Sequence, residues 1–134
     1  MNLEHFGMDT ITLAGPLEAR LGAMRAAGFT QVMLNANDLA GHPAGPAAAI
    51  ESVRTSGLRV TGFQVLRDFE GLSGHLHAYK VDSAKAMLDM CRALGSRVLL
   101  ACSSTSAHAT GEFASLKKDL QKLAMLAEPY GIRL

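Results

Sequence analysis

The 134-residue chain lacks the features that would point to a membrane, a nucleic acid or secretion. No apolar run approaches the ~20 residues that a bilayer-spanning helix needs. Residues 1–7 lack the basic segment followed by an apolar segment that marks a secretory signal. The formal net charge of +1 gives no general attraction to nucleic acid or to an anionic membrane. We therefore expect a cytoplasmic protein without a nucleic-acid or membrane partner.

Cysteine is also scarce, since the chain has only Cys91 and Cys102. These two residues lie in a helical pattern and a strand pattern, and we expect reduced, buried thiols rather than a disulfide framework. No G-x-G-x-x-G, G-x-x-x-x-G-K-[ST] or G-x-S-x-G string is present, so the sequence makes no case for a nucleotide or serine-hydrolase site. Hydrophobic residues make up 49% of the chain and charged residues 19%, which is typical of one globular domain.

A repeat of about 30 to 40 residues organises what is present. In each copy a glycine follows a helical pattern and precedes an apolar run, at Gly28, Gly57, Gly95 and Gly131. These glycines fit the left-handed residue that follows many helices. One helix and one strand per repeat form a βα unit, and such units build a parallel sheet with right-handed crossovers.

The pattern predicts four βα units and the start of a fifth strand. The expected strands are at about 7–13, 30–34, 58–66 and 97–102, with the fifth beginning at Ile132. The expected helices begin at Pro16 and Pro46 and then span about 76–94 and 111–128, with loops at 39–45 and 71–74. Two parallel α/β architectures fit, a small doubly wound domain or half of an eight-unit barrel.

In both architectures ligands bind at the carboxyl ends of the strands. Polar residues gather at three of those ends: Asn35, Asn37 and Asp38; Gln64, Arg67, Asp68 and Glu70; and Ser103, Ser104 and Thr105. The sequence therefore predicts that a binding site lies on one rim of the sheet.

Arg67 is the first candidate on this rim. Its guanidinium can hold a substrate carboxylate in a fixed two-pronged geometry, or stabilise an enolate. The alternative is a structural ion pair with Asp68 or Glu70, which would make those carboxylates partners of Arg67 or first-turn charges rather than ligands or bases. The residues alone leave both interpretations open.

The other candidates also have a structural alternative. Asn35, Asn37 and Asp38 can bind substrate hydroxyls, but turns and helix caps prefer the same residue types. Ser103 and Ser104 can bind a carboxylate or serve as loop hydroxyls. His75 and His77 lack the i, i+4 spacing of a helical metal pair, and we expect loop histidines on a solvated rim.

Several strings resemble the sugar phosphate isomerase/epimerase family, which has the xylose-isomerase-like TIM barrel. They are F-Q-V-L-R-D-F-E-G (63–71), L-N-A-N-D-L (34–39), V-L-L-A-C-S-S (98–104) and Y-G-I-R-L (130–134). The first is similar to the bacterial 3-dehydroshikimate dehydratase branch, some members of which are fused to a domain similar to 4-hydroxyphenylpyruvate dioxygenase. A glutamate frequent in the family near the end of strand two is Met33 here, which favours that branch.

The resemblance implies that residues 1–134 are the N-terminal half of a (β/α)8 TIM barrel and that the whole barrel is a metal-dependent lyase forming protocatechuate. It implies a divalent metal ion (Mg, Mn or Co) with ligands beyond Leu134 and none in this chain. The substrate would be a small molecule with a carboxylate or hydroxyls. Together with the strand-end positions, this leads us to predict Arg67 as catalytic and Asn37, Gln64, Ser103 and Ser104 as substrate-binding.

Three alternatives to the dehydratase remain. One is a sugar phosphate isomerase or epimerase. Another is a non-catalytic half-barrel that self-associates, as a homo-oligomer or with the remainder of the barrel, because an unfinished sheet edge and an open inner face tend to associate. The DNA-repair endonucleases of the same fold are disfavoured by the near-neutral charge.

Overall fold

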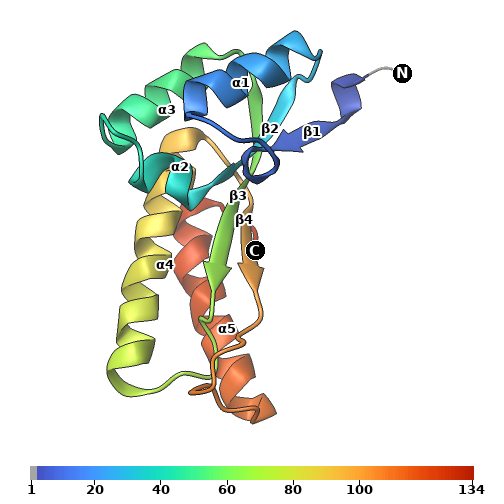
Figure 1. Cartoon of the computed structure of the whole chain (residues 1–134). Helices are drawn as coiled ribbons and strands as arrows, with labels where there is room; N and C mark the ends of the chain where they lie inside the picture. The colour runs from blue at the N-terminus through green and yellow to red at the C-terminus, as the bar shows by residue number, and fades with distance from the viewer. Residues whose placement is uncertain (1–2) are drawn as a thin grey trace.

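Four parallel strands form one sheet in the order β1-β2-β3-β4 in the computed structural model, which describes residues 3–134 (Figure 1). The strands are β1 (Gly7–Asp9), β2 (Gln31–Asn35), β3 (Arg59–Arg67) and β4 (Leu99–Cys102). The helices are α1 (Leu17–Ala26), α2 (Ala36–Ala40), α3 (Pro46–Thr55), α4 (Gly74–Leu94) and α5 (Phe113–Ala127). Short 3-10 turns occupy Leu3–His5, Thr10–Thr12 and Glu128–Tyr130.

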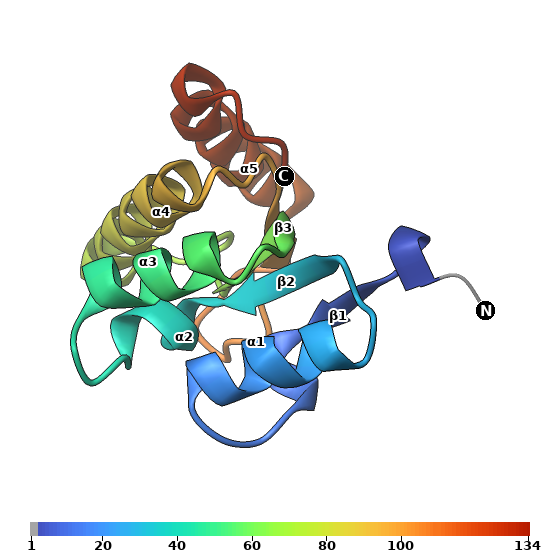
Figure 2. The same ribbon diagram turned by 90° about the horizontal axis from the view of Figure 1, so that it is seen from above.

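The strand order distinguishes the two predicted architectures. A doubly wound sheet reverses its order at a switch point and so carries helices on both faces. Here each strand lies beside its predecessor, and right-handed crossovers then place every helix on the same face. Figure 2 shows α1, α3 and α4 along one side of the strands. This is the arrangement of a barrel wall with its helices outside, as the half-barrel prediction requires.

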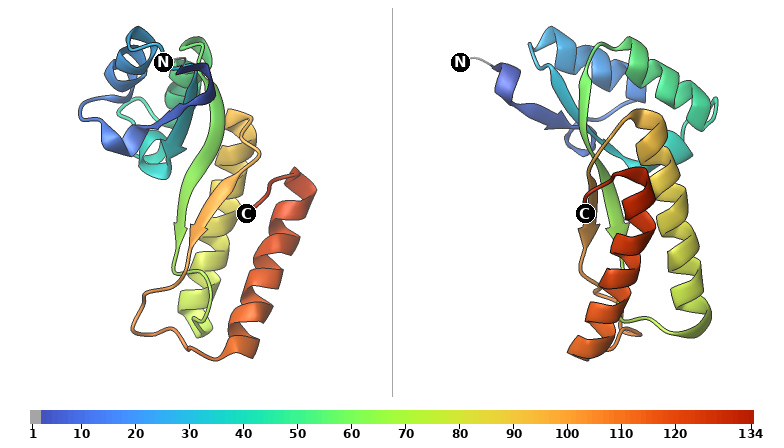
Figure 3. Two further views of the ribbon diagram at one scale, coloured as in Figure 1. Left: turned by 90° about the vertical axis from the view of Figure 1, so that its right-hand side faces the viewer. Right: turned by 180° about the vertical axis from the view of Figure 1, so that it is seen from behind.

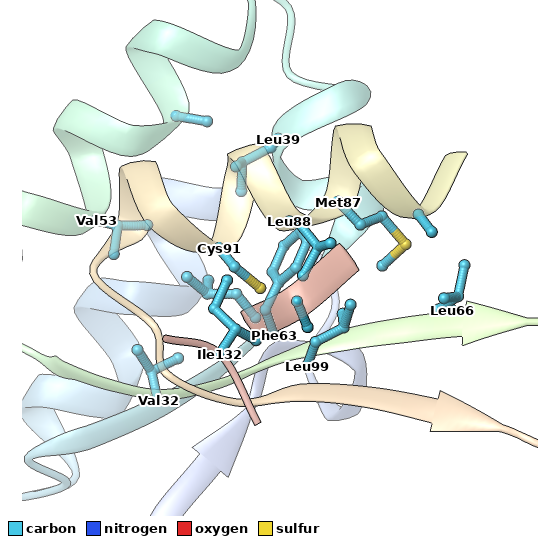
Figure 4. Close-up of a cluster of buried hydrophobic side chains, with 14 of the residues drawn as sticks. Val32, Leu39, Val53, Phe63, Leu66, Met87, Leu88, Cys91, Leu99 and Ile132 are labelled. Carbon is cyan, nitrogen blue, oxygen red and sulfur yellow. The ribbon is translucent and has the colours of Figure 1, made fainter. Parts of the chain in front are cut away.

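The core lies between the sheet and that helical layer. Phe63 of β3 and Leu99 of β4 point toward Leu88 and Cys91 of α4, and Leu66 lies farther along β3 on the same side (Figure 4); all five side chains are buried. Burial raises the pKa of the Cys91 thiol to about 12, because the thiolate would lose its hydration. Cys91 is therefore the buried thiol that the sequence predicts, whereas Cys102 is only half-buried.

The repeat predicted from glycine is confirmed. Gly28, Gly57, Gly95 and Gly131 all have positive φ angles, of 92°, 72°, 70° and 63°. Gly131 is followed by an isolated parallel bridge between Val98 and Arg133. The chain thus begins its fifth strand beside β4, and Figure 3 shows its C-terminal residues lying there.

Two predicted boundaries are wrong. The first strand ends at Asp9 instead of residue 13, because the Asp9 carboxylate accepts a hydrogen bond from the N–H of Ile11 at 3.0 Å and starts a 3-10 turn. The short helix α2 was expected as strand end and loop, but the Asn35 side chain and the Asp38 carboxylate form a capping box there.

The remaining predicted elements are present with shifted ends. The long helix begins at Gly74 and not at residue 76, and β4 begins at Leu99 and not at residue 97. In the described part of the chain, no helix is both long and apolar enough to span a membrane.

Candidate functional site

The strand register shows which side chains face away from the helices. Gln64 lies opposite Leu100 and Arg67 lies opposite Cys102 in the pairing of β3 with β4. Side chains alternate between the two faces of a strand. The register of β3 against β4 shifts between Gln64 and Leu66, and this irregularity lets both Phe63 and Leu66 enter the helical layer although they are three residues apart. Gln64 and Arg67, each the next residue after one of these two, face the opposite, inner side of the sheet. Gln64 and Arg67 therefore belong to one surface, with Arg67 at its carboxyl edge.

The Arg67 side chain is exposed at the end of β3. Within residues 3–134 its guanidinium forms no ion pair or hydrogen bond, and only its backbone oxygen is used, by the Lys80 Nζ at 2.8 Å. The structural ion pair considered for Arg67 is therefore absent. A guanidinium without a protein partner at a strand end is available to an anionic ligand.

Asp68 and Glu70 serve a different purpose from the one expected of them. The Asp68 Oδ1 accepts the Thr105 N–H at 2.8 Å, and the Glu70 Oε1 accepts the Ser104 N–H at 2.6 Å. The Thr105 N–H is the main reason that the pKa of Asp68 is lowered. Their interpretation as Arg67 partners or first-turn charges is wrong, because these carboxylates join the segment after β3 to the segment after β4.

Gly71 extends the same junction. Its carbonyl accepts the Thr110 N–H at 2.8 Å, and its own N–H donates to the Asp119 carboxylate at 2.9 Å. A Cβ at Gly71 would lie 2.8 Å from the Thr110 oxygen, and the φ angle of 80° also disfavours other residues. The last residue of the F-Q-V-L-R-D-F-E-G string is thus a packing requirement.

Gln64 has a partner that the sequence did not reveal. Its side-chain Nε2 donates to the Oδ2 of Asp9, at the end of β1, and Gln64 is only 8% exposed. Asp9 was missed because the alternation of Thr10, Ile11 and Thr12 indicated a longer strand. The polar end of the first strand is therefore Asp9, and it meets Gln64 across β2.

The polar residues after β2 are mainly structural. The Asn35 side chain accepts the Asn37 N–H at 3.0 Å, and buried Asp38 accepts from Thr10 Oγ1 and from Arg20 at 2.7 Å. Their interpretation as cap and turn residues is confirmed for Asn35 and Asp38. Asn37 is exposed and lines a hollow of about 420 Å³ together with Gly15–Glu18.

The two serines after β4 differ. The Ser104 N–H donates to Glu70 and its hydroxyl to Asp68 at 3.4 Å, so Ser104 is held within the junction. Ser103 is exposed, and with Phe113 and Leu120 it lines a groove of about 500 Å³ along α5. Among residues 3–134 no hydrogen bond engages the Ser103 hydroxyl, so it is available to a ligand.

No metal site is formed by the described residues, because no cluster of three or more His, Cys, Asp or Glu side chains lies among them. The expectation of loop histidines is wrong for His75 and His77, which lie in the first turn of α4. The ring of His77 is 3.9 Å from the Asp119 carboxylate and 3.3 Å from the Lys122 Nζ. His77 therefore belongs to the contact between α4 and α5.

Comparisons with solved structures support the barrel. The chain superposes with a TM-score of 0.85 and 33% identity on a "xylose isomerase-like TIM barrel/4-hydroxyphenylpyruvate dioxygenase fusion protein", over 95% of this chain and 20% of that one. The IolI protein with a zinc atom matches with a TM-score of 0.75 and 20% identity over 49% of its length. D-allulose 3-epimerase from Methylomonas sp., in complex with D-allulose, matches with a TM-score of 0.70 and 16% identity over 50% of its length. The chain therefore has the fold of about half of a xylose isomerase-like TIM barrel, since it covers about half the length of the IolI and epimerase structures.

Sequence comparison shows similarity to two curated proteins of one name. The chain is 35% identical over 125 residues to 3-dehydroshikimate dehydratase of Pseudomonas aeruginosa and 34% identical over 125 residues to that of Pseudomonas putida. Each match covers 93% of this chain and 20% of the relative, so the chain spans one fifth of the curated relatives it matches. No family model matches the chain. The resemblance seen in the sequence strings is confirmed.

Proposed function

We propose that this chain is the N-terminal half of a barrel that dehydrates 3-dehydroshikimate to protocatechuate. The two relatives of that name support the reaction over 93% of the chain. The observation that carries the proposal within the structure is the Arg67 guanidinium, which lies on the inner rim without a protein partner among the described residues. The dehydratase substrate has a carboxylate that such a guanidinium can bind in two-pronged fashion.

The reaction removes a proton beside a ketone and expels a hydroxyl group as water, so negative charge develops on the substrate during the proton transfer. Arg67 binds the carboxylate or stabilises this charge at the rim. Ser103 and Asn37 are exposed polar residues that bind substrate hydroxyls, and Gln64 lies deeper on the same inner face as Arg67. The Asp68 and Glu70 carboxylates hold the Ser104–Thr105 segment in place next to the end of β3.

A divalent metal ion is the cofactor that the resemblance implies. The described residues offer no ligand set for it, so its ligands would come from outside residues 3–134. When bound by ligands from the other half of the barrel, such an ion would polarise the substrate carbonyl.

The test is an assay of the full-length protein with 3-dehydroshikimate and added Mn²⁺ or Mg²⁺, in which the catechol product is detected by its absorbance. Formation of protocatechuate with loss of turnover after chelation supports the proposal. No product, together with turnover of a sugar phosphate in the same preparation, would replace it with the isomerase or epimerase alternative. The observation in favour of that alternative is the fold that this chain shares with D-allulose 3-epimerase.

A non-catalytic, self-associating half-barrel is the second candidate, and the exposed apolar side chains favour it. Phe113 is 79% exposed, Leu120 46% and Leu100 40%. Phe113 and Leu120 line the groove along α5, and Leu100 lies on the inner face of β4. We propose that these surfaces are covered by a second copy or by the other half of the barrel, because apolar patches of this kind associate.

Sedimentation of the purified 134-residue chain tests the second candidate. The expected result is a dimer or larger species that shifts toward monomer in the Phe113→Ser and Leu120→Gln double variant. Tyr79→Ser is the matched control, because Tyr79 is 66% exposed on α4 outside that groove. A folded, stable monomer of the unmodified chain would contradict self-association.

A further inference from the structure

The amide of Gln64 has only one orientation open to it. An ionised carboxylate accepts hydrogen bonds and donates none, so the group that Gln64 turns toward the Oδ2 of Asp9 is its NH₂. The other Asp9 oxygen is occupied by the Ile11 N–H at 3.0 Å, which fixes the carboxylate in turn. The Asp9 carboxylate therefore fixes the Gln64 amide with its NH₂ group toward Asp9.

The end left over is the carbonyl oxygen, Oε1. In the part of the chain that the structure describes, this atom has no hydrogen-bond partner and it is not among the fully enclosed unpaired atoms. It lies on the inner face of β3, the same face as Arg67. An accessible acceptor without a donor on a binding face is completed by a donor from a ligand.

We propose that Asp9 is a positioning residue that makes this site select a ligand hydroxyl at Gln64. The inference rests on the proposed function and names a feature of its substrate class: a carboxylate at Arg67 and a hydroxyl, deeper in the barrel, at Gln64. A second carboxylate is excluded from the deeper position, because it would meet the Gln64 oxygen and the charge of Asp9. A hydroxyl fits there because it donates.

The spacing agrees with a small ring. The β4 residues opposite Gln64 and Arg67 are Leu100 and Cys102, two residues apart. That separation along a strand is roughly 7 Å. A six-membered ring with a carboxylate at one side and a hydroxyl at the other spans this order of distance, whereas a linear dicarboxylate would place a charge against Asp9.

The test compares two ligands of the full-length protein by competitive inhibition or by titration. Shikimate carries ring hydroxyls, and cyclohex-1-ene-1-carboxylate is the same ring acid without them. The unmodified protein is expected to bind shikimate about 10-fold more tightly, a preference of the size that one or two hydrogen bonds supply. Gln64→Met removes the acceptor and should bring the ratio of the two dissociation constants, cyclohexene carboxylate over shikimate, close to one.

Asp9→Asn is the decisive variant. Asparagine can accept from or donate to Gln64, so the amide is free to rotate and the preference should fall several-fold while the affinity for cyclohexene carboxylate stays within about two-fold. Asp82→Asn, on an exposed position of α4, is the control and should leave the ratio unchanged. A purely structural loss would weaken both ligands equally.

An unchanged ratio in both Asp9→Asn and Gln64→Met would overturn the inference, as would a wild-type protein without any preference. Both substitutions nearly preserve shape, and one folded variant is enough for the comparison. The dehydratase assay is separate: a protein that forms no protocatechuate, but whose ratio changes as described, would refute the proposed reaction and support the role of Asp9.

Discussion

Glu70 accepts the backbone N–H of Ser104 at 2.6 Å, although the two residues are 34 positions apart in the chain. Glu70 is only 7% exposed, so the bond joins the ends of β3 and β4 in a poorly hydrated place. Because neighbouring Asp68 accepts from Thr105 in the same way, the rim beside Arg67 is fixed by carboxylates of its own motif.

Replacing Glu70 with alanine removes the hydrogen bond between its carboxylate and the half-buried Ser104 N–H, and hydrogen bonds to charged groups contribute about 1.5–3 kcal/mol. We expect the free energy of unfolding of the full-length protein, measured in urea, to fall by that amount. Glu128→Ala is the control, because Glu128 is exposed at the end of α5 and its loss should stay within about 0.5 kcal/mol. Equal effects of the two substitutions would show that the Glu70–Ser104 hydrogen bond contributes nothing to the free energy of unfolding.

Arg20 and Asp38 form the second buried junction, with 2.7 Å between the guanidinium and the carboxylate. Asp38→Ala strands the positive charge of Arg20 in a site where its side chain is 14% exposed, and breaking such a pair costs about 3–5 kcal/mol. The double variant Arg20→Met, Asp38→Leu removes both charges and should be less destabilised than Asp38→Ala alone. Urea unfolding of the three proteins measures this, and a double variant less stable than the single one would refute the account.

Glu18 makes the stability of the folded protein depend on pH. Its hydrogen bond with His42, at 2.8 Å, is the main reason that the pKa of Glu18 is lowered to about 2 from its usual 4.5, and hydrogen bonds from its own backbone N–H and from the Ser52 hydroxyl add to the effect. Since the folded pKa lies below the unfolded one, the stabilisation is present above about pH 4.5 and is lost as the pH falls toward 2. The contribution is small because Glu18 is exposed.

Glu18→Gln should therefore unfold at a lower urea concentration than the unmodified protein at pH 6, and the gap should close between pH 4.5 and pH 2. Glu128→Gln, measured alongside, should show no such closing gap. A Glu18→Gln difference that grows as the pH falls would have the wrong sign and would exclude this explanation.

The sequence predicted the parallel order of elements because each βα unit carries its own signals. The glycines such as Gly95 mark helix ends locally, and the apolar run before Arg67 marks a strand that is buried by its neighbours. These are properties of short segments, so they can be recognised without the fold.

The contacts of the rim could not be predicted in this way. Asp9 and Gln64 are 55 residues apart and Glu70 and Ser104 are 34 apart, and no local pattern pairs them. Asp68 and Glu70 lie within three residues of Arg67 in the sequence, which favoured an ion pair. In the structure their carboxylates instead accept hydrogen bonds from the segment after β4. Helix α2 was missed because an Asn-x-x-Asp capping box resembles the turn chemistry of a strand end.

The central claim is that the free guanidinium of Arg67 binds the substrate. The direct measurement is kcat and KM of the full-length protein for 3-dehydroshikimate with Arg67→Met, and with Arg59→Met, an exposed arginine at the other end of β3, as the control. Charged hydrogen bonds are worth about 1.5–3 kcal/mol each, so Arg67→Met should lower kcat/KM by about 10- to 100-fold and Arg59→Met should leave it within about two-fold. If Arg67→Met retained the wild-type kcat/KM, the guanidinium would have no part in the reaction and the account would be wrong.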